Sequence, residues 1–166
     1  RRVDEQREPG AEPGVEREGP APTTLRESAP EEPERDEREV EKAYARAVFN
    51  VLFHNRDDHP KNFAWRLGGD RRWRLAPAFD LTFSEGPMGH HHMDVCGEGN
   101  AVKRSHLLRL ASEGGVATKA AEATIDRMVA QAVTFSQRAA AYPIRRTTVQ
   151  RMKASIHNCQ KKLMRE

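Results

Sequence analysis

The 166-residue sequence has few cysteines and no long apolar run. Its two cysteines, Cys96 and Cys159, fit neither a metal-ligand spacing nor a disulfide framework, and we interpret them as ordinary thiols. No stretch approaches the roughly 18 consecutive apolar residues of a membrane-spanning helix. No charged, apolar and small-residue signal peptide opens the chain. These absences predict a protein without a membrane partner and favour the cytoplasm.

An excess of one charge is also missing. Lys and Arg number 28 and Asp and Glu number 25, which gives a formal net charge of +3. This balance is too even to make nucleic acid the first candidate for a direct partner. The length suits one domain, with or without a tail. The chain starts with Arg1 rather than Met, which leaves open that it belongs to a longer protein.

Residues 1–39 differ in composition from the rest. They contain 13 acidic and seven basic residues, six of the ten prolines and only six apolar residues. Such a segment cannot bury enough apolar surface to offset the entropy of ordering it. We therefore predict a disordered, acidic, Pro/Gly-rich tail over 1–39, with a helix beginning near Asp36. A linker without a role and a functional acidic tail both remain open.

Residues 40–166 carry a net charge of +9 and are predicted to form the folded domain. Apolar residues at helical spacing indicate a core helix from Val40 to about His54. Two short alternating runs, Phe63–Leu67 and Arg72–Leu75, flank a Gly-Gly-Asp turn and predict a β-hairpin. Residues 84–102 are predicted to form an irregular loop.

The remainder is predicted to be helical. Ser105 is placed as the cap of a helix that stops at Gly114-Gly115. Thr118 is placed as the cap of a long amphipathic helix that ends before Pro143. Thr147 or Thr148 opens the last helix. The predicted fold class is therefore α+β, mainly α-helical, with one short hairpin.

A short polar motif carries the chemistry. Asp57, His59 and Asn62 form an Asp-x-His-x-x-Asn loop after the first helix, and Asp80 follows Phe79 after the hairpin. Phosphoryl transfer needs one carboxylate for the attacking hydroxyl and separate oxygen ligands for Mg²⁺. The five-residue step from Asp57 to Asn62 equals the step from the catalytic Asp to the metal-binding Asn of protein kinases, which favours Asp57 over Asp58 as the base. An ordinary polar turn would explain the first motif alone, but not the pair of motifs.

Three runs of residues together carry a resemblance to a known family: Phe49–Leu52, Asn55–Asn62 and Trp73–Leu81. Together they resemble the C-terminal region of HipA-family toxins, which are serine/threonine kinases of bacterial toxin–antitoxin modules. Gly97–Asn100 and Leu107–Ala111 also resemble that family, and the similarity covers roughly residues 40–140. The resemblance implies a protein-kinase-like C-terminal lobe over 40–166, in an incomplete kinase fold.

The resemblance also implies roles for single residues. Asp57 would be the catalytic base, and Asn62 and Asp80 would hold Mg²⁺. The ATP site would be formed by His59, Pro60, Lys61, Asn62, Phe79 and Asp80. The activity would transfer the γ-phosphate of ATP to a protein Ser or Thr. The family's targets include an aminoacyl-tRNA synthetase, and its partner is a DNA-binding antitoxin, so contact with DNA would be indirect.

One departure from the family pattern limits this interpretation. Nothing before residue 40 supplies the phosphate-covering loop and the strand lysine that a kinase needs. The chain alone is therefore expected to be nearly inactive. A kinase of a small-molecule substrate and a degenerate, non-catalytic binding module remain as alternatives. His90–His92, with His54 and His106, are interpreted as solvated histidines rather than a metal site.

Overall fold

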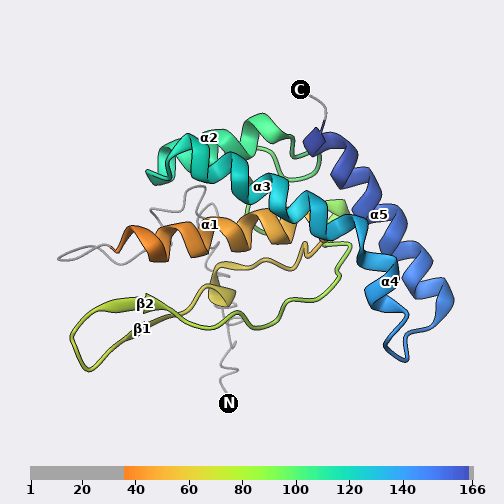
Figure 1. Cartoon of the computed structure of the whole chain (residues 1–166), viewed down its shortest axis with the longest axis horizontal. Helices are drawn as coiled ribbons and strands as arrows, with labels where there is room; N and C mark the ends of the chain where they lie inside the picture. Colours follow the sequence, from red (N-terminus) through yellow and green to blue (C-terminus); the bar gives the residue numbers. More distant parts are fainter. Residues whose placement is uncertain (1–35, 165–166) are drawn as a thin grey trace, which may run out of the picture.

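The computed structural model describes residues 36–164, and these are mainly helical with one antiparallel hairpin (Figure 1). This is the fold class that the sequence predicts. The elements in chain order are α1 (Glu37–Leu52), η1 (Pro60–Asn62), β1 (Trp65–Leu67), β2 (Trp73–Leu75), η2 (Pro87–Gly89), α2 (Arg104–Gly114), α3 (Thr118–Val133), α4 (Phe135–Ala139) and α5 (Arg146–Met164).

Helix α1 begins directly after Asp36, whose carboxylate accepts a hydrogen bond of 3.0 Å from a backbone N–H of the first turn. An Asp at this position satisfies a donor that the helix itself cannot. Tyr44, Val48 and Leu52 lie four residues apart and have no exposed surface, so they define the buried side of the helix. The predicted first helix is thus confirmed.

Helix α1 lies between α2 and α3 on one side and the hairpin on the other (Figure 1). Helix α3 also packs against α2 and α5. The largest fully buried apolar side chains of the described residues are Tyr44, Leu52, Leu107, Ile125, Leu163 and Val48. They come from α1, α2, α3 and α5, so these four helices share one core.

The helix starts differ slightly from the prediction. Ser105 lies inside α2, because the side chain of His106 provides the capping acceptor: its Nδ1 accepts the N–H of Lys103 at 3.0 Å. Thr118 is the first residue of α3 rather than its cap. The predicted stop of α2 is confirmed, since Gly115 has a φ of 76°, which disfavours any residue with a side chain.

The long helix predicted to reach Pro143 is divided into α3 and α4 at Thr134. The hydroxyl of Thr134 donates to the carbonyl of Gln131 at 2.9 Å. Such local side-chain bonds compete with the regular helical pattern. The last helix, α5, begins at Arg146, one residue before Thr147 and two before Thr148, the two predicted starts.

The hairpin is confirmed with its predicted turn. Its facing pairs are Trp65–Leu75, Arg66–Arg74 and Leu67–Trp73. In the turn, the guanidinium of Arg74 donates to the carboxylate of Asp70 at 2.9 Å. This hydrogen bond is the main cause that lowers the pKa of Asp70 to about 2. The turn is therefore closed by an exposed ion pair.

Two buried charged side chains of α1 fasten the hairpin to the helix. The Oε2 atom of Glu39 accepts the N–H of Leu75 at 2.9 Å. The Nη2 atom of Arg46 donates to the carbonyl of Ala76 at 2.8 Å. Ala76 in turn donates its N–H to the carbonyl of Ala64 at 2.8 Å. The segment after the hairpin therefore starts from a fixed point beside α1.

Helix α1 starts slightly before the predicted boundary between residues 39 and 40. Residues 1–35 lie outside the described residues, so the disorder of the acidic tail stays a prediction. Within 36–164, every helix is too short or too polar to cross a lipid bilayer.

Candidate active site

The loop over residues 55–62 follows α1 and is fixed at both ends. Asn55 Nδ2 donates to Asn50 Oδ1 at 3.0 Å, and its backbone N–H donates to the carbonyl of Asn50 at 2.9 Å. At the other end, His59 Nδ1 accepts the N–H of Lys61 at 3.2 Å and caps η1. Pro60 occupies the first position of η1, where its missing N–H costs nothing. The predicted polar loop thus has a defined shape.

Asn62 folds back onto this loop. Its Nδ2 donates to the carbonyl of Asp57 at 3.0 Å, which joins the two residues that the kinase spacing singles out. Asn62 is buried, and its amide oxygen is a type of ligand that Mg²⁺ accepts. The side chain of Asp57, by contrast, is 52% exposed, so a substrate can reach its carboxylate.

Arg46 connects this loop with the segment that follows the hairpin. Its Nη1 donates to the carbonyl of Asn62 at 3.4 Å, while its Nη2 holds Ala76. Its guanidinium also lies 5.4 Å from the centre of the Phe63 ring. Burial lowers the pKa of Arg46. One buried guanidinium therefore positions both Asn62 and the start of the segment that carries Asp80.

Asp80 lies midway between two fixed points, Ala76 and Ser84. The N–H of Ser84 donates to the carbonyl of His54 at 2.9 Å, and its carbonyl accepts the N–H of Arg56 at 3.3 Å. Four residues span at most about 14 Å, so Asp80 is confined to the neighbourhood of the loop. Its φ of 54° is a left-handed conformation that Asp tolerates better than most residues. Among residues 36–164, its carboxylate has no hydrogen-bond or ion-pair partner.

The other predicted ATP-binding residues surround the same loop. Lys61 is exposed, and Phe79 is 43% exposed directly before Asp80. His59 and Pro60 are partly exposed, and the ring of His59 meets that of His92 edge-on at a centroid distance of 5.6 Å. The structure thus joins Asp57 to Asn62, and it places Asp80 on a segment that is tied to the loop at Ser84, without a direct bond from Asp80 to Asp57 or Asn62.

A buried polar pair that the sequence pattern does not predict lies beside Asp57. Asp58 Oδ2 lies 2.8 Å from Nδ1 of His91, and the two side chains are 5% and 3% exposed. Asp58 Oδ1 accepts the N–H groups of His92 at 2.9 Å and Met93 at 3.3 Å. Our interpretation of the loop histidines as solvated is therefore wrong for His91. The sequence carries one signal for this pair, which is Asp58 directly after Asp57. A carboxylate that is buried needs hydrogen-bond partners.

Arg56, which directly precedes Asp57, also holds the segment that carries His90–His92. Its Nη1 donates to the carbonyl of Gly89 and its Nη2 to that of Asn100 at 3.3 Å. Gly86 is required here, since it has a φ of 69° and any Cβ would overlap the carbonyl oxygen of His90. Residues 86–100 are thus packed onto the candidate active site rather than projecting from it.

His54, which precedes the loop, is also buried rather than solvated. Its Nε2 lies 3.3 Å from Glu85 Oε2, and its Nδ1 lies 3.7 Å from the sulfur of Cys159 on α5. Its ring stacks on Phe83. Burial, followed by the charge of Arg56, lowers the pKa of His54. Within 36–164, no group of three or more His, Cys, Asp or Glu side chains is placed to hold a metal ion.

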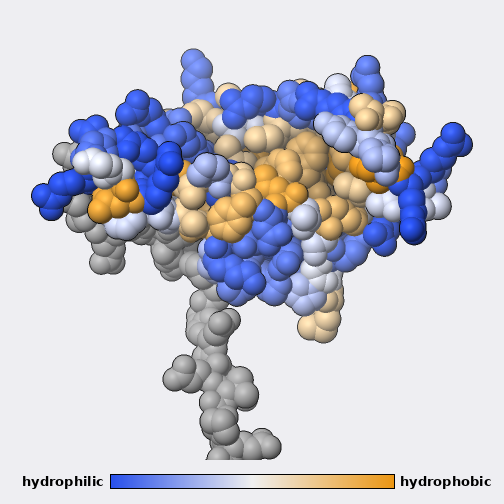
Figure 2. Space-filling view, turned by 90° about the horizontal axis from the view of Figure 1, so that it is seen from below, coloured by the Kyte–Doolittle hydropathy of each residue, from blue (hydrophilic) through white to orange (hydrophobic). Residues whose placement is uncertain are grey.

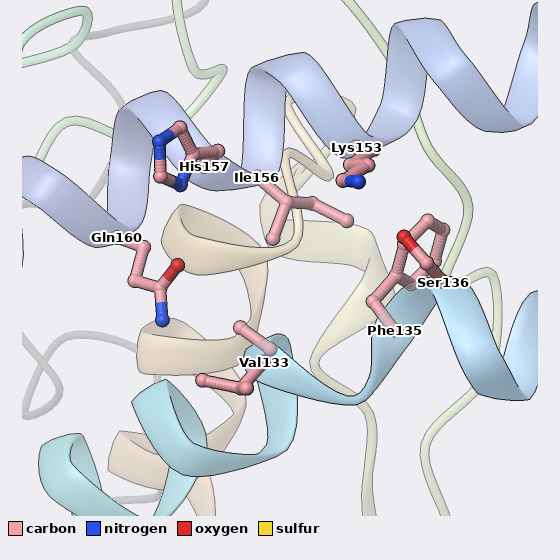
Figure 3. A pocket seen from close by; sticks show the side chains of 8 residues that line it. Val133, Phe135, Ser136, Lys153, Ile156, His157 and Gln160 are labelled. Atoms are coloured by element: carbon pink, nitrogen blue, oxygen red, sulfur yellow. The ribbon is translucent and has the colours of Figure 1, made fainter.

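A pocket of about 270 Å³ lies elsewhere, between α5 and the junction of α3 and α4 (Figure 3). Ile156 points into it from α5, opposite Val133 and Phe135. Its lining residues are Ala132, Val133, Phe135, Ser136, Lys153, Ile156, His157 and Gln160. None of them is a predicted site residue, so the candidate active site is not this pocket.

The hairpin side of the molecule carries apolar surface. Figure 2 shows an apolar area on this face, bordered by hydrophilic residues. The exposed large apolar side chains of the hairpin and the segment after it are Leu67, Trp73, Phe79 and Leu81. Phe79 and Leu81 flank Asp80 in the sequence, so exposed apolar surface adjoins the predicted metal ligand.

The arrangement of helices, hairpin and polar loop resembles part of a solved structure. The chain is similar to HipA from the complex of HipA, HipB and operator DNA of the Shewanella oneidensis MR-1 toxin–antitoxin system. The TM-score is 0.61 and the sequence identity 17%, with 75% of this chain and 31% of the HipA chain covered. At this identity the similarity establishes the fold.

A comparison with a protein-family model identifies the family of the chain. The model of the HipA-like C-terminal domain matches residues 21–135, which is more than half of the chain. The chain therefore belongs to the family of HipA-like C-terminal domains, as the sequence resemblance implies. The match includes all the predicted site residues and begins within the predicted tail. No curated protein matches the chain.

Proposed function

We propose that this chain forms the C-terminal catalytic lobe of a HipA-like serine/threonine protein kinase. The intact protein would transfer the γ-phosphate of ATP to a protein Ser or Thr, as the toxin of a cytoplasmic type II toxin–antitoxin module. The observation that carries this proposal is the bond from Asn62 Nδ2 to the carbonyl of Asp57. It gives the Asp-x-His-x-x-Asn motif a closed shape in which the two residues serve one site.

Asp57 is the better candidate for the base. A residue that deprotonates or orients a substrate hydroxyl must be within hydrogen-bond reach of it. The carboxylate of Asp57 is half exposed, whereas that of Asp58 is buried and bonded to His91 and two backbone N–H groups. The spacing argument and the exposure therefore favour the same residue.

The donor set fits Mg²⁺. Asn62 uses its amide nitrogen within the loop, which leaves its oxygen as the atom that would bind the metal. Asp80 offers an exposed carboxylate without a partner among residues 36–164. One amide and one carboxylate oxygen, completed by phosphate oxygens and water, are a usual protein share of a magnesium–nucleotide site. When bound, Mg²⁺ would neutralise charge on the transferred phosphoryl group.

The remaining site residues have supporting roles. The exposed Lys61 would supply positive charge on the phosphate side of the ATP site, next to His59 and Pro60. Phe79 would pack beside the nucleotide because it is exposed directly before Asp80. Catalysis of phosphoryl transfer consists mainly of such positioning and charge stabilisation.

The chain spans about 31% of the similar HipA chain, so other parts of the protein belong to the proposal as well. The lid and the strand lysine would come from outside the described lobe. We therefore expect the 166-residue chain alone to phosphorylate at a rate near background, since loss of one stabilising group typically costs about 10² in rate.

The proposed partners are a protein substrate and an antitoxin. The similar HipA was solved with HipB and operator DNA. By analogy, an antitoxin that binds DNA would be the partner here, and DNA would be contacted only through it. An aminoacyl-tRNA synthetase is the candidate substrate that the family resemblance suggests.

A nucleotide titration of three variants, with and without Mg²⁺, tests the assignment. Asp57→Asn keeps both metal ligands, so Mg-dependent nucleotide binding should persist. Asp80→Asn removes a charge and should weaken that binding, and Asn62→Ala should weaken it less because a neutral ligand is lost. If Asp57→Asn lost Mg-dependent binding and Asp80→Asn kept it, the roles of base and metal ligand would have to be exchanged between Asp57 and Asp80. No Mg-dependent binding by the unaltered intact protein would favour a non-catalytic binding module.

A phosphate-transfer assay with labelled ATP tests the remaining alternative, which is a kinase of a small-molecule substrate. If the intact protein transferred phosphate from ATP to a metabolite but to no protein, the enzyme would be a small-molecule kinase. Transfer to a Ser or Thr side chain that depends on Asp57 is the expected result.

A further inference from the structure

We propose that His92 is a positioning residue for Asp57, and that the buried Asp58–His91 pair holds it in place. The proposal rests on the proposed function, in which Asp57 is the base. It assigns a role to a histidine segment that lies 35 residues after Asp57 in the chain.

The first observation is the contact between the two exposed side chains. His92 Nε2 lies 3.3 Å from Asp57 Oδ1, and the side chains are 38% and 52% exposed. This contact of the imidazole with Oδ1 limits the orientation of the carboxylate and leaves Oδ2 for the substrate hydroxyl. The ring of His59, edge-on to His92, limits the position of the imidazole from the other side.

The second observation is how the backbone of His92 is held. Its N–H donates to Asp58 Oδ1 at 2.9 Å and lies 3.3 Å from the carbonyl oxygen of Arg56. The two residues that flank Asp57 thus both contact the same N–H group. The side chain of His92 is thereby presented to the residue between them.

The third observation is the burial of the pair beneath. Asp58 Oδ2 bonds His91 Nδ1 at 2.8 Å, and both side chains are almost completely buried. Consecutive histidines therefore face consecutive aspartates: His91 contacts Asp58 inside the protein, and His92 contacts Asp57 at the surface. The inner pair fixes the register, and the outer pair is the functional one.

Nitrogen NMR of the imidazole side chains of the 166-residue chain tests the outer contact. Asp57→Asn changes an exposed residue and should leave the fold intact. We expect it to shift the Nε2 signal of His92 more than any other imidazole signal. The exposed His157 on α5 is the matched control and should not move. An unchanged His92 signal would overturn the proposal.

The positioning role is tested by repeating Asp57→Asn in two backgrounds, Asp58→Asn and His91→Gln. Without the inner pair, we expect the response of His92 to be lost or strongly reduced. A response of undiminished size in both backgrounds would overturn the role of the inner pair.

Hydrogen exchange in the unaltered chain tests the inner pair without any variant that could fail to fold. In the unaltered chain, the amides of His92 and Met93 should be protected, because both donate to Asp58. Exchange of these two amides as fast as that of exposed loop amides would also overturn the proposal.

None of these measurements needs nucleotide, so the two proposals fail separately. Coupling between His92 and Asp57 without Mg-dependent nucleotide binding by the intact protein would refute the kinase function, and with it the catalytic purpose of the contact. Nucleotide binding without that coupling would refute only the role of His92.

Discussion

Helices α1, α2, α3 and α5 and the segment over residues 53–103 contribute to one apolar core, but the segment also buries many polar side chains. The helices share an apolar core in which Leu107, Ile125 and Leu163 have no exposed surface. The segment buries polar side chains, among them Arg56 and Asp58. Within 36–164, every buried polar or charged residue lies on α1 or in this segment, and none on α2 to α5.

The difference reflects what each region has to do. Apolar packing is non-directional and tolerates small shifts. Hydrogen bonds from buried side chains depend on distance and angle, so they fix atoms in place. The helices therefore supply an apolar core, and the polar interior of the segment fixes the backbone that carries Asp57, Asn62 and Asp80. The predictions below test this division, from the largest expected effect to the smallest.

Removing Asp58 should cause the largest loss. Asp58→Ala leaves His91 and two backbone N–H groups without their buried partner, and breaking a buried pair in this way costs about 3–5 kcal/mol. The free energy of unfolding in urea measures this loss. The matched control is the neighbouring Asp57→Ala, which changes an exposed side chain and should cost no more than about 0.5 kcal/mol. Equal losses from the two variants would contradict the buried role of Asp58.

The apolar core should respond to truncation next. Ile125→Ala removes a fully buried side chain of α3 and should lower the free energy of unfolding by about 2–5 kcal/mol. Val133→Ala on the same helix is the control, because Val133 is 70% exposed and its loss should cost about 0.5 kcal/mol or less. If Ile125→Ala also released the amides of His92 and Met93 to fast exchange while the protein stayed folded, the two regions would not be separable.

Cys96 gives a pH-dependent test of the segment. Burial, and after it the carboxylate of Glu113, raises the pKa of Cys96 to about 11. Only the thiolate reacts, so alkylation at pH 8 should be on the order of 100-fold slower than that of free cysteine. The rate should rise about tenfold per pH unit until the pH nears the pKa. A Cys159→Ser background isolates the signal, and a rate that levels off near pH 9 would refute the burial of this thiol.

The smallest expected effect concerns the junction between the two regions. Glu39→Ala leaves the buried N–H of Leu75 without an acceptor, which should cost about 1–3 kcal/mol. Faster exchange of the Leu75 amide should accompany the loss. Glu41→Ala, on the exposed side of α1, should change neither quantity. If the two variants behaved alike, the hairpin would not depend on Glu39.

The same contrast between the two regions explains which parts of the structure the sequence predicts and which it does not. Periodic apolar residues predicted α1 and the other long helices, and two glycines with Asp70 predicted the hairpin turn. These signals are local. The ends of helices were less predictable, because His106 caps α2 in place of Ser105, and a hydroxyl bond at Thr134 divides a continuous pattern.

In the candidate site, spacing predicted which residues matter, but not what holds them. The step from Asp57 to Asn62 is local and carries the kinase resemblance. The pairing of Asp58 with His91 joins residues 33 positions apart, and that of Arg46 with Ala76 joins residues 30 positions apart. Such contacts depend on how the chain folds back, so no short pattern encodes them.

The most direct test of the central assignment asks whether Asn62 and Asp80 bind one divalent ion. Mn²⁺, a paramagnetic substitute for Mg²⁺, can be titrated into the 166-residue chain together with a nucleotide while amide NMR signals are followed. We expect the signals of Asn62 and Asp80 to broaden together at the lowest Mn²⁺ concentrations, and Asp80→Asn to remove that broadening at both positions. Broadening at only one of the two residues, or equal broadening in the Asp80→Asn variant, would contradict a shared metal site.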